Sequence, residues 1–249
     1  MRGRALPAGF ASITAGRCAI VVRSSNMDDA RALLAEGTPY EAAARDLAAR
    51  AMEGRGVTYA ITLPASGERV VVRRNRHGGL LARMSGTLFV PPSRAPHELA
   101  VSLRLHTAGV RTPAVVMYAL ERVHGVFCHA DVVTEEIVDS RDLAAFMQPG
   151  IAARDRTAAW SAARDLLATL NAVGARHHDL NVKNILLSPT PTGFVAWVLD
   201  VDRVIFGVPG GERVRKGNAT RLLRSAIKWR ELRGARFSDE EASLVGRLS

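Results

Sequence analysis

The sequence contains little of what several common classes of protein require. It has only two cysteines, Cys18 and Cys128, which are far apart and lack the spacing of metal ligands. This excludes a disulfide-rich scaffold and a cysteine zinc site. One disulfide between them remains open, although reduced thiols are favoured. Aromatic residues make up 5% of the chain, too few for the stacking surfaces typical of proteins that bind single-stranded nucleic acid. We expect no nucleic acid partner.

Long apolar runs are also missing. No window approaches about 18 uninterrupted apolar residues, so the sequence predicts no membrane-spanning helix. The N-terminal stretch begins with basic residues, but Pro7, Gly9 and Arg17 interrupt its apolar part. We therefore expect no signal peptide and predict a cytoplasmic protein.

Positive charge is present in excess. The 249 residues include 34 Lys and Arg against 24 Asp and Glu, a net charge of +10. Such a chain attracts polyanions, whether phosphorylated ligands, nucleic acid or an anionic membrane surface. A GC-rich coding sequence would enrich arginine and alanine without any binding role, so charge alone does not choose among these.

The first half of the chain predicts a sheet with a few helices. Thr38, Pro39 and Glu41 form a capping-box pattern with proline at the first helical position, which predicts a helix from 38 to about 52. A second helix is expected over 95–109, ending at a glycine. β-rich runs predict strands at 54–63, 68–74, 114–120 and 125–137.

The second half predicts helices around one small β element. Apolar residues recur at helical spacing in 154–174, at Trp160, Leu166, Leu167 and Leu170. A hairpin is expected over 184–201, a basic helix over 219–232 and a last helix over 238–248. The sequence thus predicts an α+β fold, with a sheet-rich N-terminal lobe over 1–138 and a helical C-terminal lobe over 139–249. A ligand cleft between two lobes is the natural expectation.

One stretch carries the chemistry, "RHHDLNVKNILL" at 176–187. Asp179 precedes Asn184 by five positions, and an apolar strand later ends at Asp200. Phosphoryl transfer needs these groups, because one carboxylate must accept the proton of a hydroxyl nucleophile while an amide and a second carboxylate hold Mg²⁺. The order and spacing match a kinase catalytic loop and its metal-binding aspartate.

"HHDLNVKN" resembles the catalytic loop of protein-kinase-like enzymes. Further segments narrow the resemblance: "VVVRRNRHGGLLARM", "HELAVSLRLHTAGVRTP", "ADVVTEEI", "LDVDR" and "NATRLLRSAIK". Together they resemble the lipopolysaccharide core kinase family, of the 3-deoxy-D-manno-octulosonic acid (Kdo) kinase type. The resemblance extends over nearly the whole chain. The "RHGG" segment and "LDVDR", a variant of the usual DFG, are its most specific parts.

The resemblance implies a protein-kinase-like two-lobed fold, with an antiparallel-sheet N-lobe and a reduced helical C-lobe. It implies an enzyme that uses ATP and Mg²⁺ to phosphorylate a hydroxyl of a Kdo sugar in Kdo-lipid A. Asp179 would be the catalytic base, and Asn184 and Asp200 the Mg²⁺ ligands. Glu98 would be the glutamate of the kinase ion pair, with Arg73 as its partner on a strand.

The chain departs from the general kinase pattern in two of these places. The strand partner of the glutamate is normally lysine, and Arg74 and Arg76 compete with Arg73 for that position. Arginine can bind phosphate and carboxylate bidentately, so the departure does not argue against activity. Gly54 and Gly56 lie where the nucleotide-covering loop is expected, but a third glycine is missing.

Several alternatives remain open. Only 49 residues follow Asp200 in this chain, too few for a protein-kinase peptide-binding lobe, which favours a small or lipid-linked acceptor. That acceptor could be another core sugar such as heptose, or another small molecule, and a pseudokinase without activity also remains possible. The basic helix predicts either a solvated face or contact with anionic lipid. We favour a protein lying on the cytoplasmic face of the inner membrane, with Kdo-lipid A as its partner.

Overall fold

The computed structural model describes residues 6–52, 56–75, 94–123 and 127–246. Its contacts divide the chain into two compact units, which we describe separately. Unit 1 comprises Met1–Ala100 and Ala114–Glu136, and unit 2 comprises Val101–Pro113 and Ile137–Ser249. The division at 138/139 stays a prediction about domains. The contact units differ from it because Val101–Pro113 packs with unit 2.

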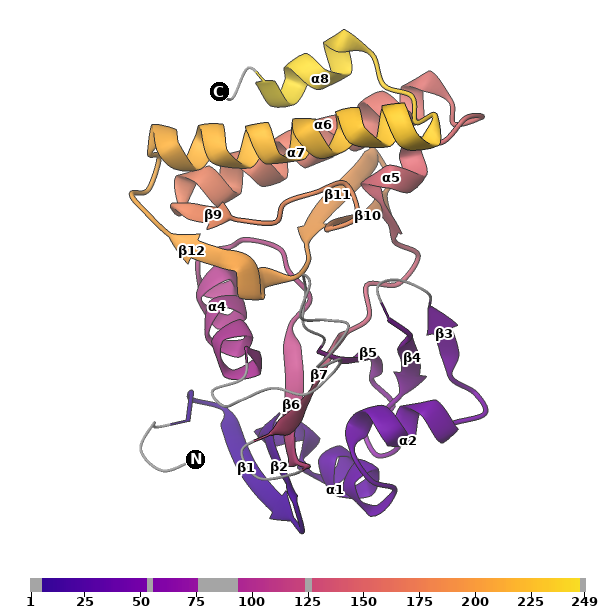
Figure 1. Cartoon of the computed structure of the whole chain (residues 1–249), viewed down its shortest axis with the longest axis vertical. Helices are drawn as coiled ribbons and strands as arrows, with labels where there is room; N and C mark the ends of the chain where they lie inside the picture. The colour runs from indigo at the N-terminus through magenta and orange to yellow at the C-terminus, as the bar shows by residue number, and fades with distance from the viewer. Residues whose placement is uncertain (1–5, 53–55, 76–93, 124–126, 247–249) are drawn as a thin grey trace. The chain divides into compact units, whose positions relative to one another are not determined.

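Within its described residues, unit 1 is built on one seven-stranded sheet (Figure 1). The strands are β1 (Phe10–Ala15), β2 (Cys18–Arg23), β3 (Arg50–Met52), β4 (Thr58–Thr62), β5 (Arg69–Arg74), β6 (Val115–Arg122) and β7 (Cys128–Glu135). Their order is β1-β2-β6-β7-β5-β4-β3, and every pair is antiparallel. The antiparallel sheet expected of the N-terminal part is therefore present.

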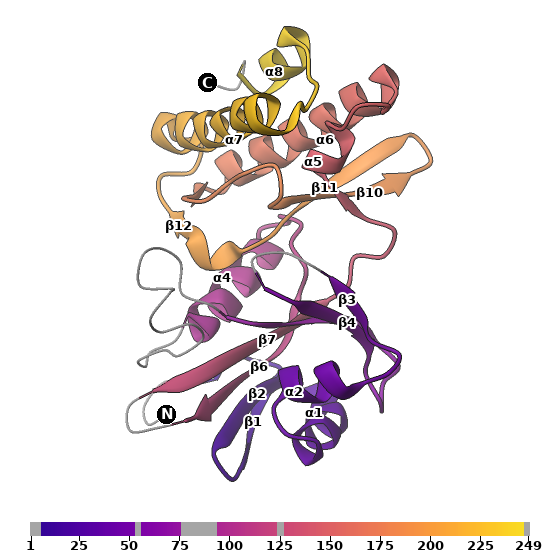
Figure 2. The ribbon, with the colours of Figure 1, turned by 45° about the vertical axis from the view of Figure 1, so that its right-hand side comes forward.

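Two short helices, α1 (Met27–Ala35) and α2 (Pro39–Arg45), lie side by side against this sheet (Figures 1 and 2). Strand residues at alternate positions, such as Val70 and Val72, turn into the core beneath them, because successive strand side chains point to opposite faces. The helices contribute small residues to this core, including Ala30 and Ala43.

The helix predicted over 38–52 is shorter than expected. Its capping box forms as predicted, since the Thr38 side chain accepts from the Glu41 backbone N–H and the Glu41 carboxylate accepts from the Thr38 N–H. The helix ends at Arg45, because Asp46 adopts an extended conformation and its side chain accepts the Ala48 N–H at 2.8 Å. The rest of the predicted helix, up to about 52, instead forms a turn and the short strand β3.

The two cysteines are free thiols in the structure. Cys18 and Cys128 are both buried, and burial raises the pKa of Cys18 to about 12. This agrees with the favoured reduced state and gives neither thiol the character of a reactive nucleophile.

Within the residues that the structure describes, unit 2 is mostly helical around two small sheets. Its helices are α5 (Leu143–Phe146), α6 (Ala153–Ala172), α7 (Glu212–Arg233) and α8 (Asp239–Gly246), and α4 (Ala95–Thr107) ends within it. Its strands are β8 (Arg141–Asp142), β9 (Ala175–His177), β10 (Ile185–Thr190), β11 (Gly193–Val198) and β12 (Val204–Phe206). Strands pair in the orders β11-β10-β8 and β12-β9. Helices α6 and α7 lie side by side, with α8 against both (Figures 1 and 2).

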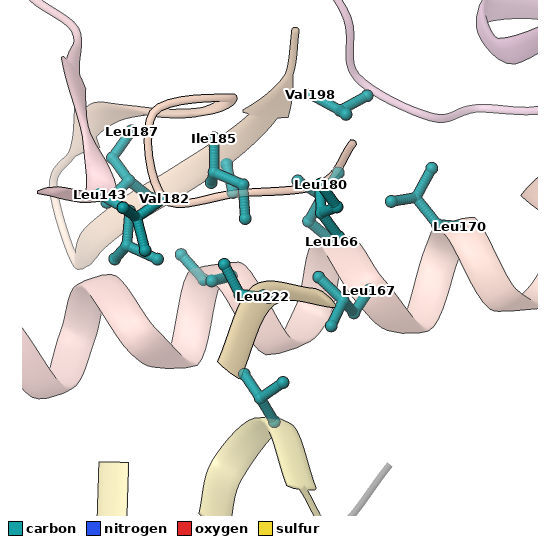
Figure 3. Packing of buried hydrophobic residues seen from close by; sticks show 14 of the residues in the cluster. Leu143, Leu166, Leu167, Leu170, Leu180, Val182, Ile185, Leu187, Val198 and Leu222 are labelled. Carbon is teal, nitrogen blue, oxygen red and sulfur yellow. The ribbon is translucent and has the colours of Figure 1, made fainter. Parts of the chain in front are cut away.

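The core of unit 2 lies between α6, α7 and the loop before β10, as Figure 3 shows. Leu166, Leu167 and Leu170 of α6, which have the helical spacing seen in the sequence, all point into it. The loop contributes Leu180 and Val182, which are fully buried. Apolar anchors therefore hold the segment that carries Asp179 and Asn184 against the helices.

No helix among the described residues is long and apolar enough to span a membrane.

Replacing Leu222 with alanine should lower the free energy of unfolding of unit 2 by about 2–5 kcal/mol, because its side chain is completely buried in α7 and a cavity would remain. The chain's three tryptophans, Trp160, Trp197 and Trp229, all lie in unit 2. Their fluorescence during urea denaturation therefore reports on this unit. Ile227, 41% exposed on the same helix, is the matched control, and Ile227→Ala should change the value by less than about 0.5 kcal/mol.

Candidate active site

The loop between β9 and β10 places Asp179 and Asn184 next to each other. The backbone carbonyl of Asp179 accepts a hydrogen bond from the Asn184 side-chain amide at 3.0 Å, and a second from Asn181 at 2.9 Å. The Asn181 side-chain oxygen in turn accepts the Lys183 N–H at 2.9 Å. These bonds use the NH₂ end of Asn184, so its side-chain oxygen is the atom left to bind a cation.

Asp200 is tied to the same loop through the residue before it. The Leu199 N–H donates to the Asn184 backbone carbonyl at 2.9 Å, which joins the end of β11 to the loop. Asp200 itself is exposed and has a left-handed backbone with φ of 54°. A non-glycine residue in this conformation is uncommon and is typical of functional sites.

His177 holds the loop and the Asp200 segment together. Its Nδ1 accepts the Asp179 N–H at 3.1 Å, so its Nε2 carries the proton and donates to the Leu199 carbonyl at 2.9 Å. Burial lowers the pKa of His177, against the opposing effects of the Leu199 carbonyl and of the carboxylates of Asp200, Asp179 and Asp202. A neutral ring is required here, since protonation of Nδ1 would remove its acceptor.

The structure thus brings together the three residues proposed from the sequence for chemistry in the second half of the chain. Asn184 contacts the backbone of Asp179, and both aspartates lie close enough to His177 to act on its ionisation. His177 supports the loop through these hydrogen bonds. The assignments of Asp179 as base and of Asn184 and Asp200 as metal ligands remain predictions.

Asn218 is a supporting residue that sequence reasoning missed. It is buried in α7, and its side chain accepts the His177 N–H at 2.9 Å and donates to the Ala175 carbonyl at 2.9 Å. The signal was present in the sequence, because Asn218 is a polar residue among the buried positions Val214, Ala219 and Leu222 of α7. A buried amide on an apolar helix face needs a partner, and here the partner is the strand that leads into the loop.

In unit 1, the expected ion pair between Arg73 and Glu98 is present. The Arg73 guanidinium on β5 donates to the Glu98 carboxylate on α4 and also to the Asn75 side chain at 2.9 Å. The Glu98 side chain is 4% exposed. Arg74, the competing candidate, instead pairs with Asp131 at 2.8 Å. A role for the Arg73–Glu98 pair in nucleotide binding remains a prediction.

The remaining predicted positions are less informative. Gly54 lies outside the described residues, as does Arg76. Gly56 lies in the connection between β3 and β4, which pair as a hairpin, whereas the sequence placed this glycine between a helix and a hairpin. The role of either glycine in covering a nucleotide stays a prediction.

The donor set fits Mg²⁺ bound to a nucleotide. Among the described residues, no group of three or more His, Cys, Asp and Glu side chains could hold a metal alone. Nucleotide-bound Mg²⁺ does not need one, because it takes one or two protein oxygens and completes its octahedron with phosphate and water. The oxygens of Asn184 and Asp200 are hard ligands of the kind required.

Replacing Arg73 with leucine should destabilise unit 1 by about 1–3 kcal/mol, because it removes the guanidinium that faces the buried Glu98 carboxylate. The double variant Arg73→Leu/Glu98→Leu should recover part of the loss, since no buried carboxylate at 98 is then left without its guanidinium. Urea denaturation followed by circular dichroism measures both. Equal losses for the single and double variants would contradict a coupled pair.

In unit 2 a loop carries an acid and an amide and is joined to a second aspartate, and in unit 1 an Arg–Glu pair links β5 to α4; these are the features expected of a kinase-like phosphotransferase. Comparison with known proteins agrees. A model of the family described as "Lipopolysaccharide kinase (Kdo/WaaP) family" matches residues 43–240. The chain belongs to this family, which confirms the resemblance seen in the sequence and the assignment as a kinase.

Curated relatives cover most of the chain. It is 28% identical over 195 residues to the 3-deoxy-D-manno-octulosonic acid kinase of Pasteurella multocida (strain Pm70), covering 76% of this chain and 79% of that protein. The protein of the same name from Actinobacillus succinogenes (strain ATCC 55618 / DSM 22257 / CCUG 43843 / 130Z) is 29% identical over 192 residues, covering 75% and 78%.

A solved structure confirms the kinase-like fold. The structure described as "WaaP in complex with acyl carrier protein" matches with a TM-score of 0.55, covering 87% of this chain and 84% of that one. At 21% sequence identity the match supports the fold alone.

Proposed function

We propose that the protein transfers the terminal phosphate of ATP to a hydroxyl of a Kdo sugar in Kdo-lipid A. Family membership and the two Kdo kinase relatives support this activity. The observation that carries the proposal is the junction of the Asp179 loop with the Asp200 segment through His177 and Asn184. In the proposed site, that junction would set a carboxylate base beside two oxygen ligands.

In the proposed reaction, Asp179 orients the acceptor hydroxyl and takes its proton. The hydroxyl oxygen forms a bond to the terminal phosphorus as the bond from that phosphorus to the ADP oxygen breaks, which leaves a sugar phosphate and ADP. The Asp179 side chain makes no hydrogen bond to another described residue, so it is available to the acceptor. His177 keeps the loop in place through the backbone N–H of Asp179.

Asn184 and Asp200 would hold Mg²⁺, which would offset the negative charge of the phosphates. Arg73 would bind phosphate oxygens through the N–H groups at the edge of its planar guanidinium, held in place by Glu98. Backbone amides near Gly54 and Gly56 would cover the nucleotide. These four residues form the proposed ATP-binding set together with the metal ligands.

The proposed location is the cytoplasmic face of the inner membrane, in peripheral contact with anionic lipid. Support comes from the second half of α7, where Arg224 and Lys228 are exposed beside Ile227 and Leu232, 41% and 67% exposed. Basic residues near an anionic leaflet contribute about 1 kcal/mol each, and exposed apolar side chains can enter the interface.

The test is phosphate transfer by the purified protein. It is incubated with ATP, Mg²⁺ and one of three acceptors, Kdo-lipid A, a heptose-bearing core, or lipid A without Kdo, and products are weighed by mass spectrometry. We expect one added phosphate on the first acceptor and none on lipid A alone. A phosphate found only on heptose would replace Kdo as the acceptor, and nucleotide binding without transfer to any glycan would favour a pseudokinase.

A further inference from the structure

Three arginines lie in a row beside the catalytic loop. Arg213, Gly217 and Arg221 are spaced by four residues on α7, so they form one stripe along the helix. The missing side chain of Gly217 makes room for Arg176 of β9, because a Cβ atom at 217 would lie 2.8 Å from the Arg176 Nε. Arg176 therefore lies against the helix between the two α7 arginines.

This arrangement is fixed by the buried contacts of α7 with β9. Asn218, next to Gly217, hydrogen-bonds the backbone on both sides of Arg176, at Ala175 and His177. Helix α7 therefore cannot rotate so as to move Gly217 away from β9 without breaking both hydrogen bonds. Arg176 is half-buried, whereas Arg213 and Arg221 are exposed at either end of the row.

His178 belongs to the same cluster. Its backbone N–H donates to the Arg203 carbonyl at 3.0 Å, while the Nε2 of its ring is buried and has no hydrogen-bond partner among the described residues. Burial lowers the pKa of His178, and the charges of Arg176, Arg221 and Arg213 lower it further. All three guanidiniums are thus near enough to act on this ring, which precedes Asp179 in the chain.

Within the part of the chain that the structure describes, no carboxylate lies within ion-pair distance of Arg176, Arg213 or Arg221. Glu212, the acid at the start of α7, pairs with Lys216 at 2.6 Å. The N-terminus of α7 adds positive potential, and Gly211 provides no capping side chain there. Like charges gathered along one face of a helix repel each other unless an anion binds among them.

We propose that Arg176, Arg213 and Arg221, with His178, form an anion-binding subsite that holds an oxyanion group of the acceptor next to Asp179. This proposal rests on the function proposed above. The group is a carboxylate or a phosphate, either of which accepts paired N–H bonds from guanidinium. In the proposed acceptor, the Kdo sugar carries the carboxylate and the lipid A part carries phosphate. The subsite would orient the sugar so that its hydroxyl meets Asp179.

The test measures binding and transfer separately. The variant Arg213→Gln/Arg221→Gln should bind Kdo-lipid A in detergent micelles at least ~10-fold more weakly than wild type, and its KM for that acceptor should rise to the same extent. Its KM for ATP and its melting temperature should not change, since both arginines are exposed. The matched control is Arg154→Gln on the exposed surface of α6, which removes one charge elsewhere and should leave both values unchanged.

Two modified acceptors identify the group that is bound. One is Kdo-lipid A without its lipid A phosphates, and the other carries methyl esters on the Kdo carboxylates. The acceptor lacking the recognised group should bind wild type and the double variant equally. Equal binding of unmodified Kdo-lipid A by wild type and the double variant would overturn the subsite. Tight binding by wild type without phosphate transfer would instead reject the proposed function and leave the subsite in place.

Discussion

Asp179→Asn should lower kcat for phosphate transfer to Kdo-lipid A by at least ~100-fold while leaving the melting temperature unchanged. The activity falls because asparagine cannot take the proton of the acceptor hydroxyl, and positioned general bases contribute about 10²–10⁴-fold. The fold is kept because the loop depends on the backbone of Asp179. Its backbone N–H donates a hydrogen bond to His177, and its backbone carbonyl accepts hydrogen bonds from Asn181 and Asn184. None of these hydrogen bonds involves the carboxylate.

The control for this variant is Asp165→Asn, which removes an exposed carboxylate from α6 in the same unit. It should retain wild-type kcat. ATP binding by Asp179→Asn, measured by calorimetry with Mg²⁺, should also remain at the wild-type level, since Asp179 is not among the proposed nucleotide ligands. A variant that kept full activity would show that another group accepts the proton.

Asp200→Gly should abolish most activity without destabilising the protein. The loss of a metal ligand should reduce the transfer rate by about 100-fold or more, since charge stabilisation by the metal is worth several kcal/mol. Stability should stay within about 1 kcal/mol of wild type, because glycine relieves the left-handed backbone at φ 54° but adds freedom to the unfolded chain. At this position the proposed metal binding therefore requires aspartate, whereas the left-handed backbone conformation favours glycine.

The comparison variant is Asp200→Asn, which keeps a residue tolerant of the left-handed conformation and an oxygen ligand without full charge. Its requirement for Mg²⁺ should shift to higher concentration, with partial recovery of the rate when Mg²⁺ is raised. An unchanged Mg²⁺ dependence in both Asp200 variants would place the metal elsewhere.

The proposed catalytic and metal-binding residues could be selected from the sequence because their spacing is local. Asp179 and Asn184 lie in the loop before β10, and Asp200 follows β11, so the β10–β11 hairpin brings the two segments together. Arg73 and Glu98 are a different case. Their ion pair joins strand β5 to helix α4, which follows it in the chain. Only the resemblance to a family suggested this pair.

The parts that sequence reasoning missed depend on long-range register. The bond from His177 to Leu199 requires β9 and the end of β11 to meet, and the position of Arg176 against Gly217 requires a specific rotation of α7. Neither follows from periodicity. The helix predicted to reach 52 failed for a local reason, because the Asp46 side chain competes for a backbone N–H that the helix needed.

The most direct test of the central claim is a single-turnover measurement of phosphate transfer from ATP to Kdo-lipid A by wild type, Asp179→Asn, Asp200→Asn and the double variant. If the two carboxylates act as parts of one site, the double variant should be no more than a few-fold slower than the slower single variant, because groups that act as a unit are not additive. Losses that multiply in full, or single variants that transfer phosphate at the wild-type rate, would contradict it.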